Sequence, residues 1–111
     1  KQGAKILVDG RNTVVEGKEG GSYVGATVID YVTPDMSVAK EEIFGPVISI
    51  MRTNTLDEAI AIENSNPYGN AAAVFTQNGG LARYVIDRAS AGMIGVNVGV
   101  PVPREPFSFG G

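Results

Sequence analysis

The feature that most constrains the fold is an alternation of short apolar runs and helical patterns in the second half of the chain. Three apolar runs, at 46–53, 71–76 and 93–98, have the length and residue types of β-strands. Two segments between them, 56–64 and 80–91, carry apolar residues at helical spacing on one side. Strand, helix and strand in this order form right-handed crossovers, which predicts an α/β fold with a largely parallel sheet and flanking helices. Strands of such a sheet are expected to be buried on both faces.

Local signals mark the ends of both predicted helices. Thr55 is followed three residues later by Glu58, and this spacing is a capping box that predicts the start of the first helix. Asn78 is expected to cap the second helix. Gly92 lies where a left-handed residue would end that helix.

The first third of the chain predicts an N-terminal β segment. A strand is expected at 6–8, and Asp9-Gly10 supports a tight turn into a returning strand at 13–15. The polar, glycine-rich stretch 16–22 predicts a loop, and 23–32 is a second extended segment rich in β-branched residues.

The length of 111 residues and the 43% hydrophobic content are those of one globular domain. No linker is evident, so the change of pattern near residue 40 is interpreted as a change of layer within that domain.

Composition excludes several kinds of chemistry. The chain contains no cysteine and no histidine, which removes thiolate catalysis, histidine general bases and His/Cys metal sites. The net charge is −3 and no block of Lys or Arg exists, so nucleic acid is not expected as a partner. No apolar run approaches the roughly 20 residues of a membrane span, and 1–10 does not resemble a signal peptide.

The segment 40–46, Lys-Glu-Glu-Ile-Phe-Gly-Pro, is the most specific motif. A carboxylate at a strand entrance can accept hydrogen bonds from ribose hydroxyls, and an aromatic ring two residues later can pack against a flat heterocycle. The alternative is a pair of acids on a solvated turn beside a core phenylalanine. Residue spacing alone favours this alternative.

The motif resembles the Glu-Glu-Ile-Phe-Gly-Pro signature of the aldehyde dehydrogenase superfamily. The resemblance implies that Glu42 hydrogen-bonds the nicotinamide ribose of NAD, that Phe44 lies against the nicotinamide, and that Gly45 and Pro46 shape the turn. It covers nearly the whole chain, although Ala26 replaces a proline that is common in the family.

Within the superfamily, the segments 66–70 and 96–103 look most like the CoA-acylating methylmalonate-semialdehyde dehydrogenases. That branch converts methylmalonate or malonate semialdehyde, with NAD and CoA, to propionyl-CoA or acetyl-CoA and carbon dioxide. The resemblance also brings the proline-rich loop 100–111 near the substrate tunnel, where Phe107 and Phe109 could line the aldehyde path. A rigid connector with buried aromatic side chains is an equal alternative for this loop.

The family forms a thioester on a cysteine, and these 111 residues contain none. The resemblance therefore implies that 1–111 is the C-terminal part of the catalytic domain of a longer homo-oligomeric enzyme, a dimer or tetramer. The expected compartment is a bacterial cytoplasm, or the mitochondrial matrix in a eukaryote, and the chain alone is expected to be inactive. Two alternatives stay open: another NAD(P)-dependent aldehyde dehydrogenase, and a stand-alone α/β module that binds a partner through free sheet edges.

Overall fold

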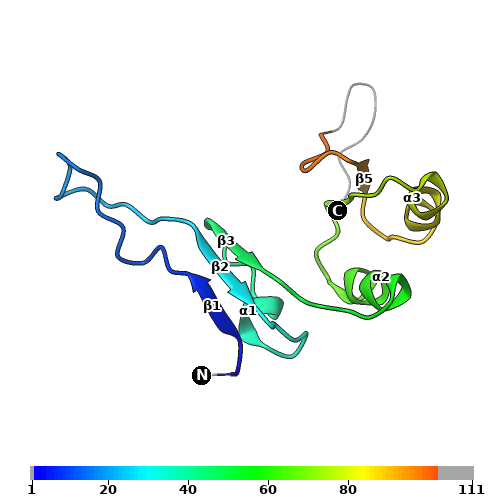
Figure 1. The fold of residues 1–111 in the computed structure, drawn as a ribbon, viewed down its shortest axis with the longest axis horizontal. Helices are drawn as coiled ribbons and strands as arrows, with labels where there is room; N and C mark the ends of the chain where they lie inside the picture. The colour runs from blue at the N-terminus through cyan, green and yellow to red at the C-terminus, as the bar shows by residue number, and fades with distance from the viewer. Residues whose placement is uncertain (1, 103–111) are drawn as a thin grey trace. The chain divides into compact units, whose positions relative to one another are not determined.

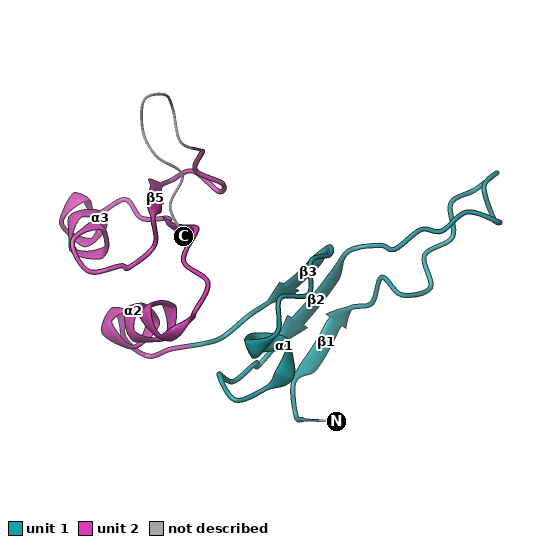
Figure 2. Ribbon diagram, turned by 180° about the vertical axis from the view of Figure 1, so that it is seen from behind, with its two compact units in different colours: residues 1–52 teal, residues 53–111 magenta. Residues whose placement is uncertain are grey.

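The computed structural model describes residues 2–102, and these form two compact units divided between Arg52 and Thr53 (Figure 2). The elements in chain order are β1 (Lys5–Val8), β2 (Thr27–Asp30), α1 (Ser37–Lys40), β3 (Val47–Ser49), α2 (Leu56–Ser65), β4 (Ala71–Val74), α3 (Gly79–Ile86) and β5 (Met93–Val96) (Figure 1). The mixture of helices and parallel strand pairs confirms the α/β class. The division lies at residue 52, not at the change of pattern near residue 40.

The first unit contains a three-stranded sheet in the order β1-β2-β3. β1 and β2 are antiparallel, with an irregularity in the register between Ile6 and Val8. β2 and β3 are parallel, and Thr27 and Ile29 are opposite Val47 and Ser49.

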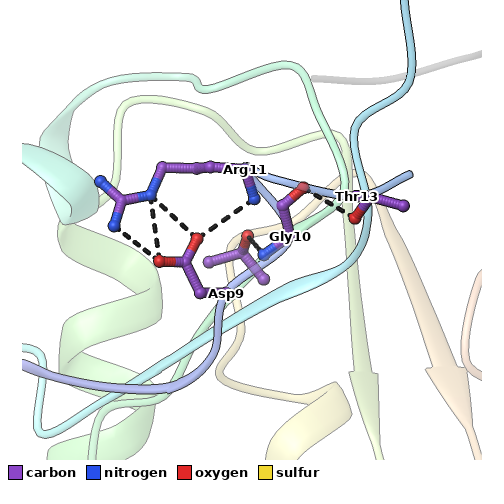
Figure 3. A network of polar contacts seen from close by, with 5 residues as sticks. Asp9, Gly10, Arg11 and Thr13 are labelled. Atoms are coloured by element: carbon purple, nitrogen blue, oxygen red, sulfur yellow. Dashed lines mark hydrogen bonds and ion pairs between the residues drawn. The ribbon is translucent and has the colours of Figure 1, made fainter. Parts of the chain in front are cut away.

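The connection from β1 to β2 runs out from the sheet and returns to it (Figure 1). The predicted strand at 13–15 is wrong, because these residues form no strand and β1 pairs with β2 instead. Two glycines explain the difference. The Gly25 amide donates to the Gly10 carbonyl at 2.9 Å, and a Cβ added to Gly10 would lie 2.0 Å from the Gly25 oxygen. The Thr13 hydroxyl also donates to the Gly10 carbonyl, at 2.9 Å (Figure 3).

α1 is a single turn that the sequence pattern does not predict, because four residues are too few to show a helical period. The Met36 carbonyl accepts from the amides of Ala39 and Lys40 at 3.0 and 3.2 Å. The side chains of Val32 and Met36 are buried and form the apolar core of this unit.

The second unit contains the parallel pair β4–β5 together with α2 and α3. Ala71 is opposite Met93, and Val74 is opposite Val96. The buried side chains of this unit come from the two helices: Ile60, Ala82 and Val85.

Both predicted helix starts are confirmed. The Thr55 hydroxyl accepts from the Glu58 amide at 3.2 Å, and the Glu58 carboxylate accepts from the Thr55 amide at 3.3 Å. The Asn78 side chain accepts from the amides of Gly80 and Leu81 at 2.9 and 3.2 Å.

The predicted end of the second helix is wrong. α3 ends at Ile86, and Gly92 is not among the residues with a positive φ. The side chain of Asn64, which lies on α2, explains the early end: its amide donates to the Arg88 carbonyl at 2.9 Å and accepts from the Ser90 amide at 2.8 Å. Backbone groups that would continue α3 are thus bonded to the other helix.

The prediction of one parallel sheet over 46–98 is also wrong in its pairing. β3 pairs with β2 in the first unit, whereas β4 and β5 form a separate sheet. The expected burial on both faces is not observed, since Ile48 of β3 is 63% exposed and Ala71 and Ala73 of β4 are exposed. Over the described part of the chain, no helix has the length and apolar character needed to cross a membrane.

Candidate functional site

The turn formed by residues 42–46, called here the 42–46 turn, leads directly into β3. All five residues are exposed, and Phe44 is 93% exposed. Phe44 therefore does not pack into a core formed by residues 2–102. The turn displays one carboxylate and one aromatic ring to solvent.

Phe44 adopts a left-handed backbone conformation with a φ of 54°. This region costs a residue with a Cβ about 1–2 kcal/mol, and such strain concentrates at ligand-binding positions. Phe44 thus combines an exposed ring with a backbone conformation that residues with a Cβ rarely adopt.

The end of the 42–46 turn is held by backbone hydrogen bonds. The Val47 amide donates to the Gly45 carbonyl at 2.7 Å, which closes a tight turn centred on Pro46. The Thr27 amide of β2 donates to the Pro46 carbonyl at 2.8 Å. Pro46 thus fulfils the expected role in shaping the turn. Gly45 has an ordinary φ, and a Cβ added there would meet no atom closer than 3.9 Å.

The Glu42 carboxylate makes no hydrogen bond or ion pair with any other residue in the range 2–102. It is exposed, so both oxygens are available as acceptors. A free carboxylate can bind two ribose hydroxyls, and the exposed Phe44 ring can cover a flat heterocycle. The side chains present therefore fit the ribose and nicotinamide of a dinucleotide.

The predicted tunnel residues Phe107 and Phe109 lie outside the described residues, so their role stays a prediction. The described residues before them contain a feature that the sequence pattern did not predict. Asn97 follows β5 with a φ of 56°, and its side-chain amide accepts from the Thr76 amide at 2.9 Å and donates to the Thr76 carbonyl at 3.1 Å. Asparagine tolerates positive φ better than most residues, and this preference was the available signal.

Tyr84 and Arg88 form a polar contact at the surface of the second unit. The Tyr84 hydroxyl donates to Asp57 at 2.6 Å, and the Arg88 guanidinium lies 3.7 Å from the centre of the Tyr84 ring. The hydrogen bond to Asp57 raises the pKa of Tyr84. The contact joins α2 to α3, which agrees with a packing role for Tyr84. Within 2–102, no group of three metal-binding side chains is present.

Residues 1–111 match the sequence pattern of the aldehyde dehydrogenase family over their whole length. The chain belongs to the aldehyde dehydrogenase family. It is 54% identical over 111 residues to the mitochondrial acylating methylmalonate-semialdehyde/malonate-semialdehyde dehydrogenase of Rattus norvegicus, covering 100% of this chain and 21% of that protein. It is 48% identical over 110 residues to a malonate-semialdehyde dehydrogenase of Pseudomonas aeruginosa, covering 99% of this chain and 22% of that protein.

Solved structures of family members have the same fold. A protein from Sinorhizobium meliloti, described as a methylmalonate-semialdehyde dehydrogenase in complex with NAD, superposes with a TM-score of 0.91 at 45% sequence identity. The match covers 98% of this aldehyde dehydrogenase chain and 22% of that protein. The chain thus spans about a fifth of the length of the relatives it matches, which include mitochondrial and bacterial proteins.

Proposed function

We propose that this chain is part of an NAD-dependent, CoA-acylating methylmalonate/malonate-semialdehyde dehydrogenase, in which Glu42 and Phe44 contact the nicotinamide end of NAD. The observation that supports the NAD site is the 42–46 turn: a carboxylate without a partner among residues 2–102 lies two residues from a 93% exposed aromatic ring, whose residue has a positive φ. The relatives named above support the substrate class. Both are named as semialdehyde dehydrogenases, and the matches cover 100% and 99% of this chain.

In the proposed reaction, residues of this chain bind and orient NAD. Glu42 accepts hydrogen bonds from the ribose hydroxyls, and such bonds are stronger than neutral ones because the carboxylate is charged. Phe44 packs its ring against the nicotinamide and excludes water from that face. NAD, when bound, supplies the acceptor for the hydride of the aldehyde. No cysteine is available in these 111 residues to form a thioester, so the contribution of this chain is positional.

The remaining parts of the proposal follow the same branch of the family. The substrates are a small semialdehyde and CoA, and 1–111 is the C-terminal part of the catalytic domain of a homo-oligomer. Phe107 and Phe109 line the path of the aldehyde. The compartment is a bacterial cytoplasm, or the mitochondrial matrix if the source is eukaryotic.

Replacement of Glu42 by Gln in the full-length enzyme tests the proposal. Glutamine keeps the shape of the side chain but removes its charge. Because hydrogen bonds to a charged group contribute about 1.5–3 kcal/mol, we expect kcat/KM for NAD to fall about 10-fold or more. Glu41→Gln is the matched control, since it removes the neighbouring exposed carboxylate, and we expect it to leave kcat/KM for NAD unchanged. Unchanged KM for NAD and unchanged kcat in Glu42→Gln would contradict the proposed role.

A further inference from the structure

Asp30, the last residue of β2, is the one buried polar or charged side chain among residues 2–102, with 3% of its surface exposed. Its carboxylate is fully engaged. The Arg52 guanidinium donates to the two carboxylate oxygens at 3.0 and 2.6 Å, and the Tyr31 amide donates to one of them at 2.7 Å. These bonds hold the pKa of Asp30 below its usual range, with the Arg52 bonds as the larger cause. Asp30 and Arg52 therefore join β2 to the segment that follows β3.

Burial of the charged Asp30 carboxylate carries a desolvation penalty. Only the Asp30 side of the pair is buried, since the Arg52 side chain is 62% exposed, and loss of Arg52 would leave the buried charge of Asp30 without its partner. The fork of the arginine restricts the geometry of the pair, since its two donors match the two carboxylate oxygens. Arg52 also lies 5.3 Å from the centre of the Tyr31 ring, which restricts the guanidinium further.

The β2–β3 pair has few other means of choosing its register. Backbone hydrogen bonds such as Ile50 amide to Ile29 carbonyl (2.8 Å) can form again after a slip along the strand. A buried hydrophobic face normally selects the register, but no apolar side chain of β2 or β3 is fully covered: Val47 is half-buried, and Ile48 is largely exposed. Asp30 and Arg52 are the side chains that join these two segments by an ion pair. The forked contact forms in the observed register, and a slip of one residue would shift Asp30 by about 3.3 Å relative to Arg52.

The register of β3 determines the position of the 42–46 turn. The turn leads directly into Val47, the first residue of β3, and the Pro46 carbonyl accepts from the Thr27 amide at 2.8 Å. A slip of one residue would move the turn by about 3.3 Å along β2 and would point alternate side chains to the opposite face. A misplacement of about 1 Å can already cost about 100-fold in rate. The ion pair lies at the far end of β2 from the turn, so it acts through the strands.

We propose that Asp30 and Arg52 are positioning residues for the cofactor: their ion pair fixes the register of β2 and β3, and thereby sets where Glu42 and Phe44 meet NAD. The inference rests on the proposed function, because it gives the 42–46 turn the role of binding NAD. It adds two residues that touch neither the cofactor nor the substrate.

A second, exposed ion pair in the same unit offers a control with the same chemistry. Arg11 donates to Asp9 at 2.9 and 2.6 Å with the same forked geometry, and lowers the pKa of Asp9 to about 2 (Figure 3). This pair joins residues two apart in the sequence, and neither belongs to a strand. Asp9→Asn therefore removes one Asp–Arg pair but leaves the Asp30–Arg52 pair between β2 and the segment after β3 intact.

The experiment compares Asp30→Asn, Arg52→Lys and Asp9→Asn in the full-length enzyme. We expect Asp30→Asn to raise the KM for NAD about 10-fold or more, while the KM for the semialdehyde changes less than about 2-fold. Arg52→Lys keeps the charge but loses the fork, so its KM for NAD should lie between those of the wild type and Asp30→Asn. Asp9→Asn should leave both KM values within about 2-fold of the wild type.

A double variant distinguishes an effect of Asp30 on the 42–46 turn from a general loss of enzyme structure. If Asp30 acts through the 42–46 turn, adding Asp30→Asn to Glu42→Gln should raise the KM for NAD by much less than Asp30→Asn does alone. Fully multiplicative effects would overturn the inference. The same holds if Asp30→Asn and Arg52→Lys lower the melting temperature but leave the KM for NAD and kcat unchanged.

Three further outcomes are distinguishable. If Asp30→Asn does not fold, Arg52→Lys decides the question alone, since the Arg52 side chain is 62% exposed and lysine is accommodated there. A normal KM for NAD and a normal kcat in Glu42→Gln would remove the proposed function, and this inference with it. A clear effect of Glu42→Gln beside no effect of Asp30→Asn and Arg52→Lys would remove only the inference.

Discussion

At the scale of the residue, backbone conformation rather than hydrophobicity decides the place of Phe44. A phenylalanine next to a Gly-Pro pair is ordinarily expected to pack into a core. Its φ of 54° instead leaves the ring almost fully exposed at the entrance to β3. Tyr31 and Asn97 have the same left-handed conformation, and each directly follows a strand of a parallel pair. Tyr31 and Asn97 thus lie where the chain leaves a strand, whereas Phe44 lies just before the chain enters one.

Substitution of Phe44 separates backbone strain from ring contacts. In the full-length enzyme, Phe44→Ala and Phe44→Gly both remove the ring, so both should raise the KM for NAD. Alanine must still adopt the left-handed conformation, whereas glycine adopts it freely, so Phe44→Gly should be the more stable variant by about 1 kcal/mol. Thermal unfolding, measured at one scan rate, ranks the two variants by stability. Greater stability of Phe44→Ala, the usual order away from positive φ, would show that the conformation is not imposed.

At the scale of the element, α2 shows how much a local signal can determine. Its start needs only Thr55 and Glu58, whose side chains and amides satisfy each other within one turn. The Glu58 carboxylate also accepts from the Asn54 amide at 2.8 Å. The end of α3, in contrast, depends on Asn64 of the other helix. The starts of α2 and α3 are local, and the end of α3 is not.

Thr55→Ala tests the capping box. Loss of the hydroxyl leaves the Glu58 amide without its acceptor, and N-cap substitutions of this kind cost about 1 kcal/mol. We expect hydrogen exchange of the first-turn amides of α2 to become about 5-fold faster, since local opening costs less by that amount. Thr55→Ser keeps the hydroxyl and is the control. Equal protection of these amides in Thr55→Ala and wild type would show that the cap contributes nothing.

At the scale of the whole molecule, the described residues cover little of their apolar surface. Ile6, Leu7 and Val8 are each about half exposed, and no side chain in this range is fully buried. Large exposed apolar surfaces mark interfaces with other protein. This exposure agrees with the proposal that the chain is part of a longer enzyme and disfavours a stand-alone module.

The chain of 111 residues, prepared by itself, should have no dehydrogenase activity. It has no cysteine to form a thioester. Incubation with malonate semialdehyde, NAD and CoA should therefore give no increase in NADH absorbance, with the full-length enzyme as the positive control. The same preparation should bind a hydrophobic dye strongly, because of its exposed apolar side chains. Turnover above background would contradict the positional role assigned to this chain.

Some features of this protein were determined by the sequence alone. The caps at Thr55 and Asn78 were predictable because the groups that bond lie within three residues of each other. β4 and β5 were predictable because their apolar runs are continuous and bounded by turns, although each strand ends two residues before the predicted bound. The motif around Glu42 and Phe44 pointed to the family because its chemistry resides in consecutive residues.

Other features were decided only by the tertiary structure. The sequence did not indicate that β3 pairs with β2, since backbone ladders form equally well with any strand of suitable length. It did not show that Gly10 and Gly25 meet in place of a hairpin, or that Asp30 reaches Arg52 over 22 residues. Each of these depends on contacts between segments distant in the chain. Periodicity and spacing show which groups are neighbours along the backbone. The partner of a strand or of a buried charge depends instead on tertiary contacts.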